Sequence, residues 1–550
     1  MSVAEREGGG RGAGTVRMRD VFDTRPSLAR EGGREVAMDD HGVRRIPADW
    51  RWGYVGATFT AAGVSTAMIY LLSGALYTIA YGAKAALIGA VVTAVYAFAA
   101  TYYIIRHVIN EGINADLLSR STFGYIGSAF NAILYATVCG FYFAAEGSVM
   151  ASALHETVPA IPYWGWAVAT NASFVLIGLF GMILLTKVQW ITLVFYFVGL
   201  ALALWALVSG WDDRVSLGHM RGWTSLNPNH VPFDVWTVLE AISSYIGVLG
   251  AILAVFTTDV ARFIRREARG FGGVFFTAVN TLFPVLVMYV TGIAMLAASG
   301  QPDPGVTLVR LIGPLGLAVT LVTQVRINLL NLYGGTLGLA NFFSRIAGFV
   351  PGRQFWVVPF LAVATGIILT PFREHFGQVT IYISIFLCAW VSTLIGERVL
   401  VRNRRPLPSW SEVRRSYLPD YNLVGLVSMW VPVAIACVMA SGLFGRHVRA
   451  LAVPFAIVTP FLLPAAVAAA LGTERLVRSY VGREVVVPPQ EQEVVECNRC
   501  RGVFHRSDFA LCPFHGGIWI CSYCCMSELK CGTMCRSEVA ILRVPILEPD

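Results

Sequence analysis

The chain has 550 residues, of which 56% are hydrophobic and only 14% are charged, and its mean hydropathy is +0.61. Soluble domains carry about 25% charged residues, so this composition excludes an ordinary soluble enzyme. The formal net charge is +8, but the Lys and Arg residues lie in loops between apolar stretches rather than on one basic face, so we expect no nucleic-acid partner.

The first 45 residues are rich in Gly, Arg and acidic residues and poor in aromatics, which predicts a disordered tail over 1–45. This segment has no apolar stretch typical of a cleaved signal peptide, and we expect none. Apolar windows then recur at close to the roughly 20 residues that cross a lipid bilayer as a helix. They predict an all-α polytopic membrane protein with twelve transmembrane helices in a domain over 46–475. The windows are 54–78, 84–106, 126–151, 163–185, 188–209, 236–258, 272–298, 308–332, 355–371, 377–396, 422–442 and 449–471.

Arginines concentrate in two of the loops between these windows, over 262–269 and 398–415. Cytoplasmic loops of membrane proteins carry the excess of Lys and Arg, which places both loops on the cytoplasmic side. An even number of spans returns the chain to the side on which it starts. We therefore expect a multi-pass protein of the cytoplasmic (inner) membrane with both termini in the cytoplasm.

Three charged side chains fall inside the predicted spans, where each costs about 2.5 kcal/mol or more unless it finds a partner or an aqueous cavity. Arg326, in the eighth window, either serves the function or reaches the surface or a neighbouring helix in a structural role. Glu146, deep in the third window, is either functional or a protonated, hydrogen-bonded core carboxyl. Glu240 lies near the outer end of the sixth window, where it can reach interfacial water.

Small residues interrupt the first and sixth windows, including Ser65 and Thr66 in the first and Gly247 and Gly250 in the sixth. Close packing of helices explains many such residues. Paired broken helices in the two halves of a secondary transporter, which build a site at mid-membrane depth, are the other interpretation. The sequence leaves both open.

Three segments carry a family resemblance. They are GINADLLSRSTFGYIGS after the second window, FTTDVARFIRRE closing the sixth and NLYGGTLGLANFF after the eighth. In order and spacing they resemble the nucleobase:cation symporter family of purine-cytosine, uracil, allantoin and hydantoin permeases, over roughly residues 46–475. The resemblance implies a leucine-transporter-like fold of two inverted five-helix repeats plus two helices. It also implies secondary transport of a flat heterocycle at a site between spans one, three, six and eight.

The resemblance also carries substrate-binding positions onto this chain. The family's Gln and Trp of span three fall on Val138 and Phe141, of which Phe141 can still stack on a planar ring. The aromatic position of span six falls on Gly250 and its polar neighbour on Leu249, and the substrate-facing Asn of span eight is retained as Asn328. Such a pocket is expected to reject polar bases unless Glu146, Asn331 or backbone groups replace the lost hydrogen-bond partners.

Sodium-coupled relatives hold the ion with paired small polar side chains of span eight. Those positions fall on Arg326 and Ile327 here, with Thr323 one turn earlier. Arg cannot ligate a cation, but its permanent charge can occupy the place of the ion. The resemblance then implies transport without sodium, either coupled to protons through Glu146 or Glu240, or by facilitated diffusion or exchange.

Eight of the eleven cysteines crowd into the C-terminal region, where seven of them and one histidine form four closely spaced pairs and Cys525 is left over. Thiolates and imidazole at this spacing fit tetrahedral Zn²⁺, and a reducing cytoplasm disfavours disulfides. Pairing first with third and second with fourth predicts two structural zinc ions in a module over 495–536, between a linker (476–494) and a tail (537–550). An iron–sulfur cluster, or a single zinc with spare thiols, is the alternative. The pairs are Cys497 with Cys500, Cys512 with His515, Cys521 with Cys524, and Cys531 with Cys535.

These features predict a secondary transporter (permease) for a small heterocyclic, nucleobase-like compound, independent of sodium and without an organic cofactor. No nucleophile–base set, phosphate loop or haem motif indicates an enzyme. The alternatives are a transporter-derived sensor or receptor that signals through the zinc tail, and a carrier of the same fold with a different, less polar substrate. The tail is either a structural knuckle, or it binds a cytoplasmic protein partner, senses metal or redox state, or gates transport.

Overall fold

The computed structural model describes residues 44–178, 182–209, 222–349, 351, 353–371, 376–405, 407, 410–480 and 494–528. Most of the predicted tail over 1–45, residues 481–493 of the predicted linker, and the chain from residue 529 lie outside the described residues. Cys531 and Cys535 are therefore outside them as well. The domain boundaries proposed from the sequence stay predictions.

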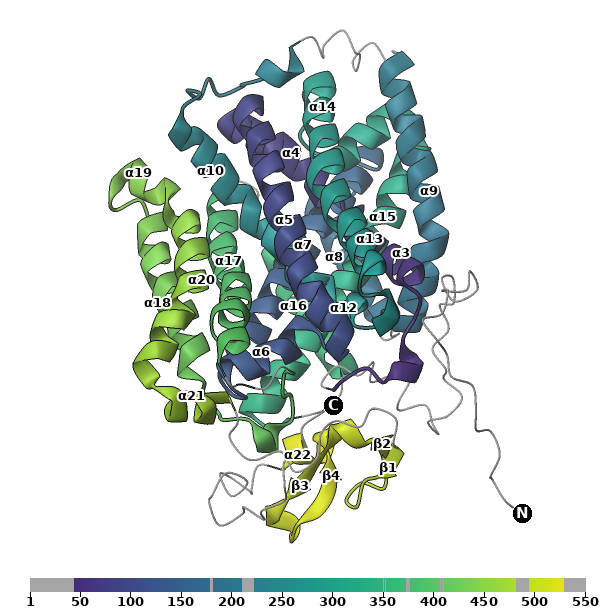
Figure 1. Ribbon diagram of the computed structural model, residues 1–550. Coiled ribbons are helices and arrows are strands. Elements are labelled where there is room, and N and C mark those ends of the chain that lie inside the picture. Colours follow the sequence, from purple (N-terminus) through teal and green to yellow (C-terminus); the bar gives the residue numbers. More distant parts are fainter. Residues whose placement is uncertain are drawn as a thin grey trace, which may run out of the picture.

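Apolar helices form a bundle, and each of the twelve predicted windows overlaps at least one of them (Figure 1). Among the described residues, eight helices are long and apolar enough to cross a membrane, or nine if a bent pair counts as one span. The polytopic all-α class is confirmed, while the count of twelve spans stays a prediction. Beyond the first and sixth spans, the helices are α5 (Ala83–Glu111), α6 (Ala115–Phe123), α7 (Ala129–Thr157), α8 (Tyr163–Gly178), α9 (Met182–Ser209), α13 (Phe271–Leu282), α14 (Tyr289–Ser299), α15 (Pro304–Ile346), α16 (Val357–Ile368), α17 (Phe376–Leu400), α18 (Leu423–Ala440), α19 (Gly445–Ala450), α20 (Ala452–Leu471) and α21 (Thr473–Tyr480).

The first span is a broken helix. Its halves, α3 (Tyr54–Ser65) and α4 (Met68–Tyr81), are bent by 40°. Ala67 has extended backbone (φ −66°, ψ 135°), which a helix cannot continue, and the Thr66 hydroxyl donates to the carbonyl of Ala62 at 2.6 Å. The break therefore leaves carbonyl groups at the end of α3 and N–H groups at the start of α4 without partners inside their own helices.

The sixth span is irregular at the matching place. It consists of α10 (Val235–Tyr245), a π-helical turn over Ile246–Ala251, α11 (Ile252–Phe256) and α12 (Thr258–Ala261). π-helical turns are rare and are frequent at functional sites. A Cβ atom on Gly247 would lie 2.2 Å from the Cα of Ser384 on α17, so this glycine permits close packing. The broken-helix interpretation therefore applies at Ser65 and Thr66, and the close-packing interpretation applies at Gly247.

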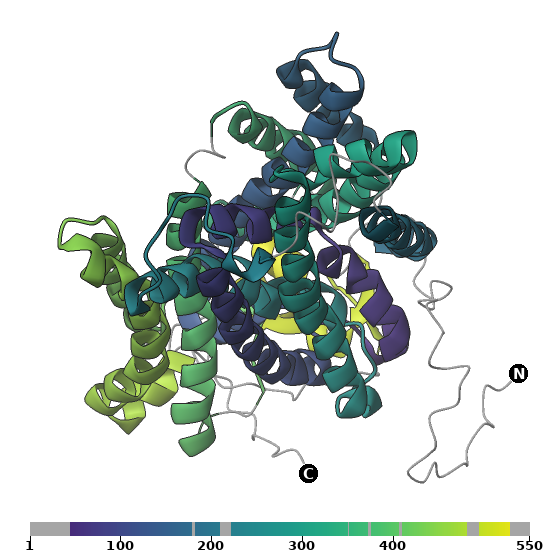
Figure 2. The ribbon, with the colours of Figure 1, turned by 90° about the horizontal axis from the view of Figure 1, so that it is seen from above.

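The C-terminal module consists of two short antiparallel strand pairs and one helix, and it packs against one end of the bundle, called the module end from here on (Figure 1). Seen from the opposite end, the module lies behind the middle of the bundle, whereas α18 and α20 stand at one side (Figure 2). Its small core gathers Phe509, Ile520 and several cysteines. The elements are β1 (Val494–Glu496) paired with β2 (Val503–His505), β3 (Phe509–Cys512) paired with β4 (Ile518–Cys521), and α22 (Ser522–Ser527).

Candidate functional site

A guanidinium group lies at the break of the first span. Arg326 comes from α15 and is fully buried, and its Nη2 donates to the hydroxyl of Thr66, the residue that caps the C-terminus of α3. Its guanidinium carbon also lies 5.0 Å from the centre of the Tyr196 ring on α9, a cation–π contact. The carbonyl end of a helix carries partial negative charge, so a fixed cation is favoured there. In discontinuous transporter helices this is the kind of place that coordinates a coupling cation.

A carboxylate lies at the other side of the same break. Glu146 of α7 is 1% exposed, and its Oε1 accepts a hydrogen bond of 3.1 Å from the backbone N–H of Ile69, in the first turn of α4. Gln324 of α15 donates to the backbone carbonyl of Glu146 at 2.9 Å, which fixes α7 against α15. Oε2 is buried and accepts no hydrogen bond from the residues that the structure describes. The amino end of α4 thus faces a carboxyl group, and the partial positive charge of a helix N-terminus favours a negatively charged group at this place.

A small cavity adjoins the break and is lined by helices of spans one, three, six and eight, the four spans that the resemblance implies. Its volume is about 20 Å³, enough for about one water molecule, so a heterocycle fits only if the helices move apart. Most of the wall is apolar or aromatic, and the carboxyl of Glu146 is its one acidic group. Lining residues include Val64, Tyr70, Tyr142, Glu146, Leu249, Phe256, Ile327 and Asn331.

Most of the substrate-binding residues expected from the resemblance do not line this cavity. Phe141 packs against Phe376 of α17, with ring centres 6.0 Å apart, and a Cβ on Gly250 would meet Thr93 of α5. Val138 is buried and also stands outside the wall. The roles of these residues stay predictions.

The residues that do line the wall are close neighbours of the expected ones. The side-chain amide of Asn328 donates to the backbone carbonyl of Phe143 at 3.3 Å, and its Oδ1 accepts from the side chain of Asn331, which lines the cavity. Tyr142 follows Phe141, and its hydroxyl donates to the carbonyl of Val248 in the π-helical turn. The sequence did not identify Tyr142 because positions 141 and 142 are both aromatic. Only the rotation of α7 about its axis decides which of the two side chains faces span six.

The residues expected to take part in coupling separate into two places. Thr323 is buried on α15, one turn before Arg326. Glu240 lies at the end of the bundle away from the module, where Arg449 of α19 pairs with it at 2.7 Å and Arg446 at 3.4 Å. This ion-pair cluster accounts for Glu240 structurally, and Glu240 does not line the cavity.

Four cysteines of the module form a candidate metal centre. Cys497 and Cys500 meet Cys521 and Cys524, and all four sulfurs lie within 4.8 Å of one another. The Sγ atoms of Cys497 and Cys524 are 3.9 Å apart, and those of Cys500 and Cys521 are 3.8 Å apart. A tetrahedral zinc ion with Zn–S bonds of about 2.3 Å holds its sulfurs about 3.8 Å apart, so the geometry fits zinc. The sequence predicted this combination of the first cysteine pair (Cys497 and Cys500) with the third (Cys521 and Cys524).

Thiolate character supports metal binding at this centre. Cys521 lowers the pKa of the Cys524 thiol to about 6 by hydrogen bonding to it. The backbone N–H of Cys521 also points at the sulfur of Cys497 at 3.3 Å. Cys512 and His515 are not members of the cluster, and His515 lies 3.6 Å from Glu528. Because Cys531 and Cys535 are outside the described residues, the second zinc ion stays a prediction.

Replacing Cys497 and Cys500 together by Ser is expected to remove about one zinc ion per chain, because two thiolates cannot hold the ion against exchange with water. Elemental analysis of purified full-length protein measures this directly. Cys437, a half-buried thiol on α18, supplies the matched control, and Cys437→Ser is expected to leave the metal content unchanged. Equal metal content in all three proteins would show that the four thiolates hold no metal.

The broken first span, the irregular sixth span and the cavity between four spans are features of secondary transporters. The fold is similar to that of Mhp1, described as a nucleobase-cation-symport-1 family transporter, in a closed conformation with bromovinylhydantoin bound. That match has 18% identity and a TM-score of 0.55, and it covers 78% of this chain and 95% of Mhp1. The inward-facing conformation of Mhp1 matches with 17% identity, the same coverage and a TM-score of 0.57. No protein-family model and no curated protein matches the chain.

Mhp1 belongs to the family that the three sequence segments resemble, and the similarity confirms the leucine-transporter-like fold. At this level of identity the similarity concerns the fold. The substrate and the coupling mechanism have to be argued from the residues of this chain.

Proposed function

We propose that this protein is a secondary transporter that moves a small planar heterocycle, of nucleobase or hydantoin type, across the membrane. One observation carries the proposal: a cavity at the break of the first span, walled by spans one, three, six and eight of an Mhp1-like fold. The tyrosines and apolar side chains of the wall suit a flat ring. The carboxyl of Glu146 and the amide of Asn331 offer partners for its polar edge.

Uptake into proteoliposomes tests this function. Purified protein is expected to move at least one of hydantoin, allantoin, uracil, cytosine or hypoxanthine, and a thermal-shift screen against the same compounds selects the first to try, because a ligand that binds the native state raises its stability. Binding without uptake would favour the sensor alternative. Uptake restricted to apolar aromatic compounds would favour a carrier of less polar substrates.

Coupling is proposed to proceed without sodium and through the proton of Glu146. Arg326 supports the first part, because its guanidinium occupies the carbonyl end of α3 where a coupling cation would lie. Glu146 supports the second part, because the residue lines the cavity, one of its oxygens is held by α4, and the other accepts no hydrogen bond from the described residues. Such a carboxyl can take up or release a proton as the cavity opens.

The protein is proposed to lie in the cytoplasmic membrane, with the module end facing the cytoplasm. The Arg-rich loops over 262–269 and 398–415 lie at this end, as the positive-inside rule requires. All the cysteines that the structure describes are free thiols, in agreement with a reducing compartment. The module itself is proposed to hold zinc in a structural role.

Replacing Asn331 by Ala is expected to weaken binding of the transported heterocycle about threefold to tenfold, because one hydrogen bond worth about 0.5–1.5 kcal/mol net is lost. Titration calorimetry with the compound identified by uptake measures the change. Asn171 on α8 is the matched control, since it is equally buried but donates to Thr365 away from the cavity. Equal affinities for wild type and Asn331→Ala would exclude this residue from the binding site.

A further inference from the structure

The segment that leads into the first span is buried against the C-terminal module. Arg44 pairs with Asp508 of the module at 3.5 Å, and its guanidinium carbon lies 5.0 Å from the centre of the Phe504 ring. Arg44 is 1% exposed and Asp508 is 2% exposed, so water is excluded from the pair. Residues 44–52, called the lead segment from here on, thus begin on the module and end at α3.

The loop between spans ten and eleven holds the module from a second side. Arg414 donates to the backbone carbonyl of Phe509 at 3.0 Å. Arg415 donates to the carbonyls of Cys525 and Glu528 at 3.1 and 2.6 Å. These contacts fix both strand β3 and the end of helix α22, which carries one of the four thiolates.

A third contact is apolar. The side chain of Met526 on α22 is buried between Tyr125, which follows α6, and Leu418 of the loop. Methionine fills such irregular gaps well because its side chain is unbranched. The module therefore contacts three separate parts of the module end: the lead segment, the region after α6 and the loop between spans ten and eleven.

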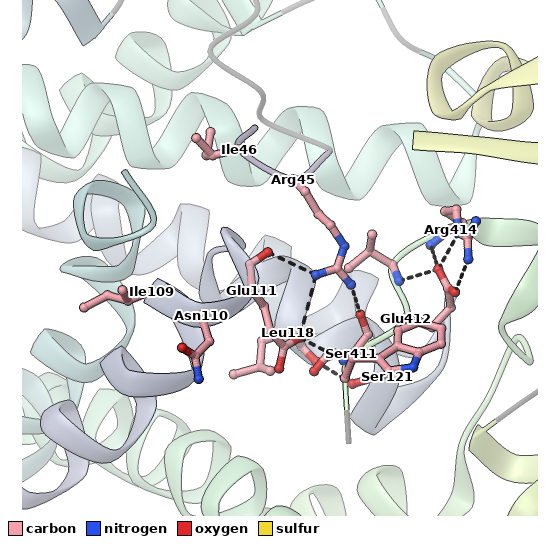
Figure 3. A network of polar contacts seen from close by, with 12 residues as sticks. Arg45, Ile46, Ile109, Asn110, Glu111, Leu118, Ser121, Ser411, Glu412 and Arg414 are labelled. Atoms are coloured by element: carbon pink, nitrogen blue, oxygen red, sulfur yellow. Dashed lines mark hydrogen bonds and ion pairs between the residues drawn. The ribbon is translucent and has the colours of Figure 1, made fainter. Parts of the chain in front are cut away.

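Polar contacts join these parts to one another (Figure 3). Arg45 of the lead segment donates to the carbonyl of Glu111 at 3.0 Å and also to the carbonyl of Ser411. The N–H of Ser411 donates to the Glu111 carboxylate at 2.8 Å, and the neighbouring Glu412 pairs with Arg414 at 2.7 Å. The network thus runs from the lead segment, through the end of span two, to the arginine that holds the module.

The lead segment is also fixed to the end of span six. Trp52 stacks on Phe263 with ring centres 4.8 Å apart, and its carbonyl accepts from the N–H of Arg265 at 3.0 Å. Alternating access requires one group of helices to move relative to the other around the site. Because α3 continues the lead segment and ends at Thr66 beside Arg326, a movement of the lead segment would be transmitted to the site.

We propose that the C-terminal module, folded around one metal ion held by Cys497, Cys500, Cys521 and Cys524, is a lock that keeps the module end of the transporter closed. Three of the seven buried residues of its core are metal-site cysteines and two more are other cysteines, so little apolar core is left to fold it without the ion. Loss of the metal unfolds the module, releases Arg44 and Arg414, and frees the lead segment to move. This inference goes beyond the proposed transport and does not depend on the identity of the substrate.

Hydrogen exchange in the purified full-length protein tests the lock, with zinc bound and after treatment with a zinc chelator. Backbone amides of the lead segment, among them the Ile46 N–H that bonds to Gly112 at 2.8 Å, are expected to exchange about tenfold faster without metal. Adding Zn²⁺ back is expected to restore the slow rate. The first turn of α10, held at the opposite end by its own ion pairs, is expected to keep its rate. Unchanged exchange in the lead segment, or equal acceleration in α10, would overturn the proposal.

A variant that leaves the metal centre intact separates docking from folding of the module. Asp508→Asn removes the charge that faces Arg44 and is expected to retain zinc while the lead segment exchanges about tenfold faster. Glu496→Gln is the matched control, because Glu496 pairs with Arg501 on an exposed surface of the module. Wild-type exchange in Asp508→Asn, with zinc bound, would show that the docked module does not restrain the lead segment.

Discussion

Transport by the wild-type protein is expected to proceed at the same rate in sodium and in choline buffer. The guanidinium of Arg326 already lies at the carbonyl end of α3, against Thr66 and the Tyr196 ring. A sodium ion about 4 Å from this charge would be repelled by about 4 kcal/mol at an effective dielectric constant near 20, which weakens its binding about a thousandfold. Initial uptake rates in proteoliposomes with matched buffers measure the effect, and a steep dependence on sodium would contradict it.

Arg326→Ala is expected to reduce uptake below detection and to lower stability, because the carbonyl end of α3 loses the charge that orders it. Arg310 lies earlier in α15, before its kink at Ile312 and Gly313, and pairs with Glu156 in a partly exposed position, so Arg310→Ala is the matched control and should transport normally. If sodium restored uptake in Arg326→Ala, the guanidinium would be shown to stand in for the ion. Wild-type uptake by Arg326→Ala in choline buffer would refute any role for the charge.

The sequence was sufficient where the chemistry of single residues determines the structure. Arg326 had to find a partner because a buried charge is costly, whereas around Thr66 a broken helix was one of two interpretations that the sequence left open. The pairing of Cys497 and Cys500 with Cys521 and Cys524 followed from ligand spacing alone.

Rotation of helices about their axes was harder to predict. One residue turns a helix face by about 100°, so the expected Phe141 faces Phe376 while the adjacent Tyr142 reaches the π-helical turn and the cavity. The π-helical turn over Ile246–Ala251 itself shifts the face of span six, which places Leu249 rather than Gly250 in the wall. No local pattern in the sequence signals such a turn.

Docking of the module was not predictable from local pattern either. Arg44 and Asp508 are far apart in the chain, and each has an ordinary surface sequence around it. Only the fold brings them together in a buried pair. The same holds for Glu240, whose partners Arg446 and Arg449 come from a short helix after the eleventh span. Glu240 and Glu146 both lie inside predicted spans, but in the structure Glu240 belongs to an ion-pair cluster and Glu146 to the cavity wall.

The other large effect is expected from Glu146→Gln, which should abolish proton-driven accumulation. A gradient of one pH unit supplies about 1.4 kcal/mol per proton, enough to accumulate a neutral substrate about tenfold. Proton-driven accumulation needs a group at the cavity that exchanges its proton, and the proposed group is Glu146, which lines the cavity and has one buried oxygen without a hydrogen bond from the described residues. A glutamine keeps the shape and can still accept from Ile69, but it carries no proton to transfer. The variant should therefore only equilibrate the substrate, at a rate independent of the gradient.

Glu240→Gln distinguishes the two carboxyls that the sequence offered for coupling. Its partners Arg446 and Arg449 hold Glu240 at the end of the bundle away from the module, so this variant should still accumulate substrate when the proton gradient is imposed. Accumulation is measured in proteoliposomes with the pH inside fixed and the pH outside varied, and exchange of preloaded substrate confirms that each variant is folded. Accumulation that survives in Glu146→Gln and fails in Glu240→Gln would move the coupling site from the cavity to the ion-pair cluster. Because Glu146 accepts from the first turn of α4 and also lines the cavity, a change in its protonation is expected to affect both the break and the substrate site.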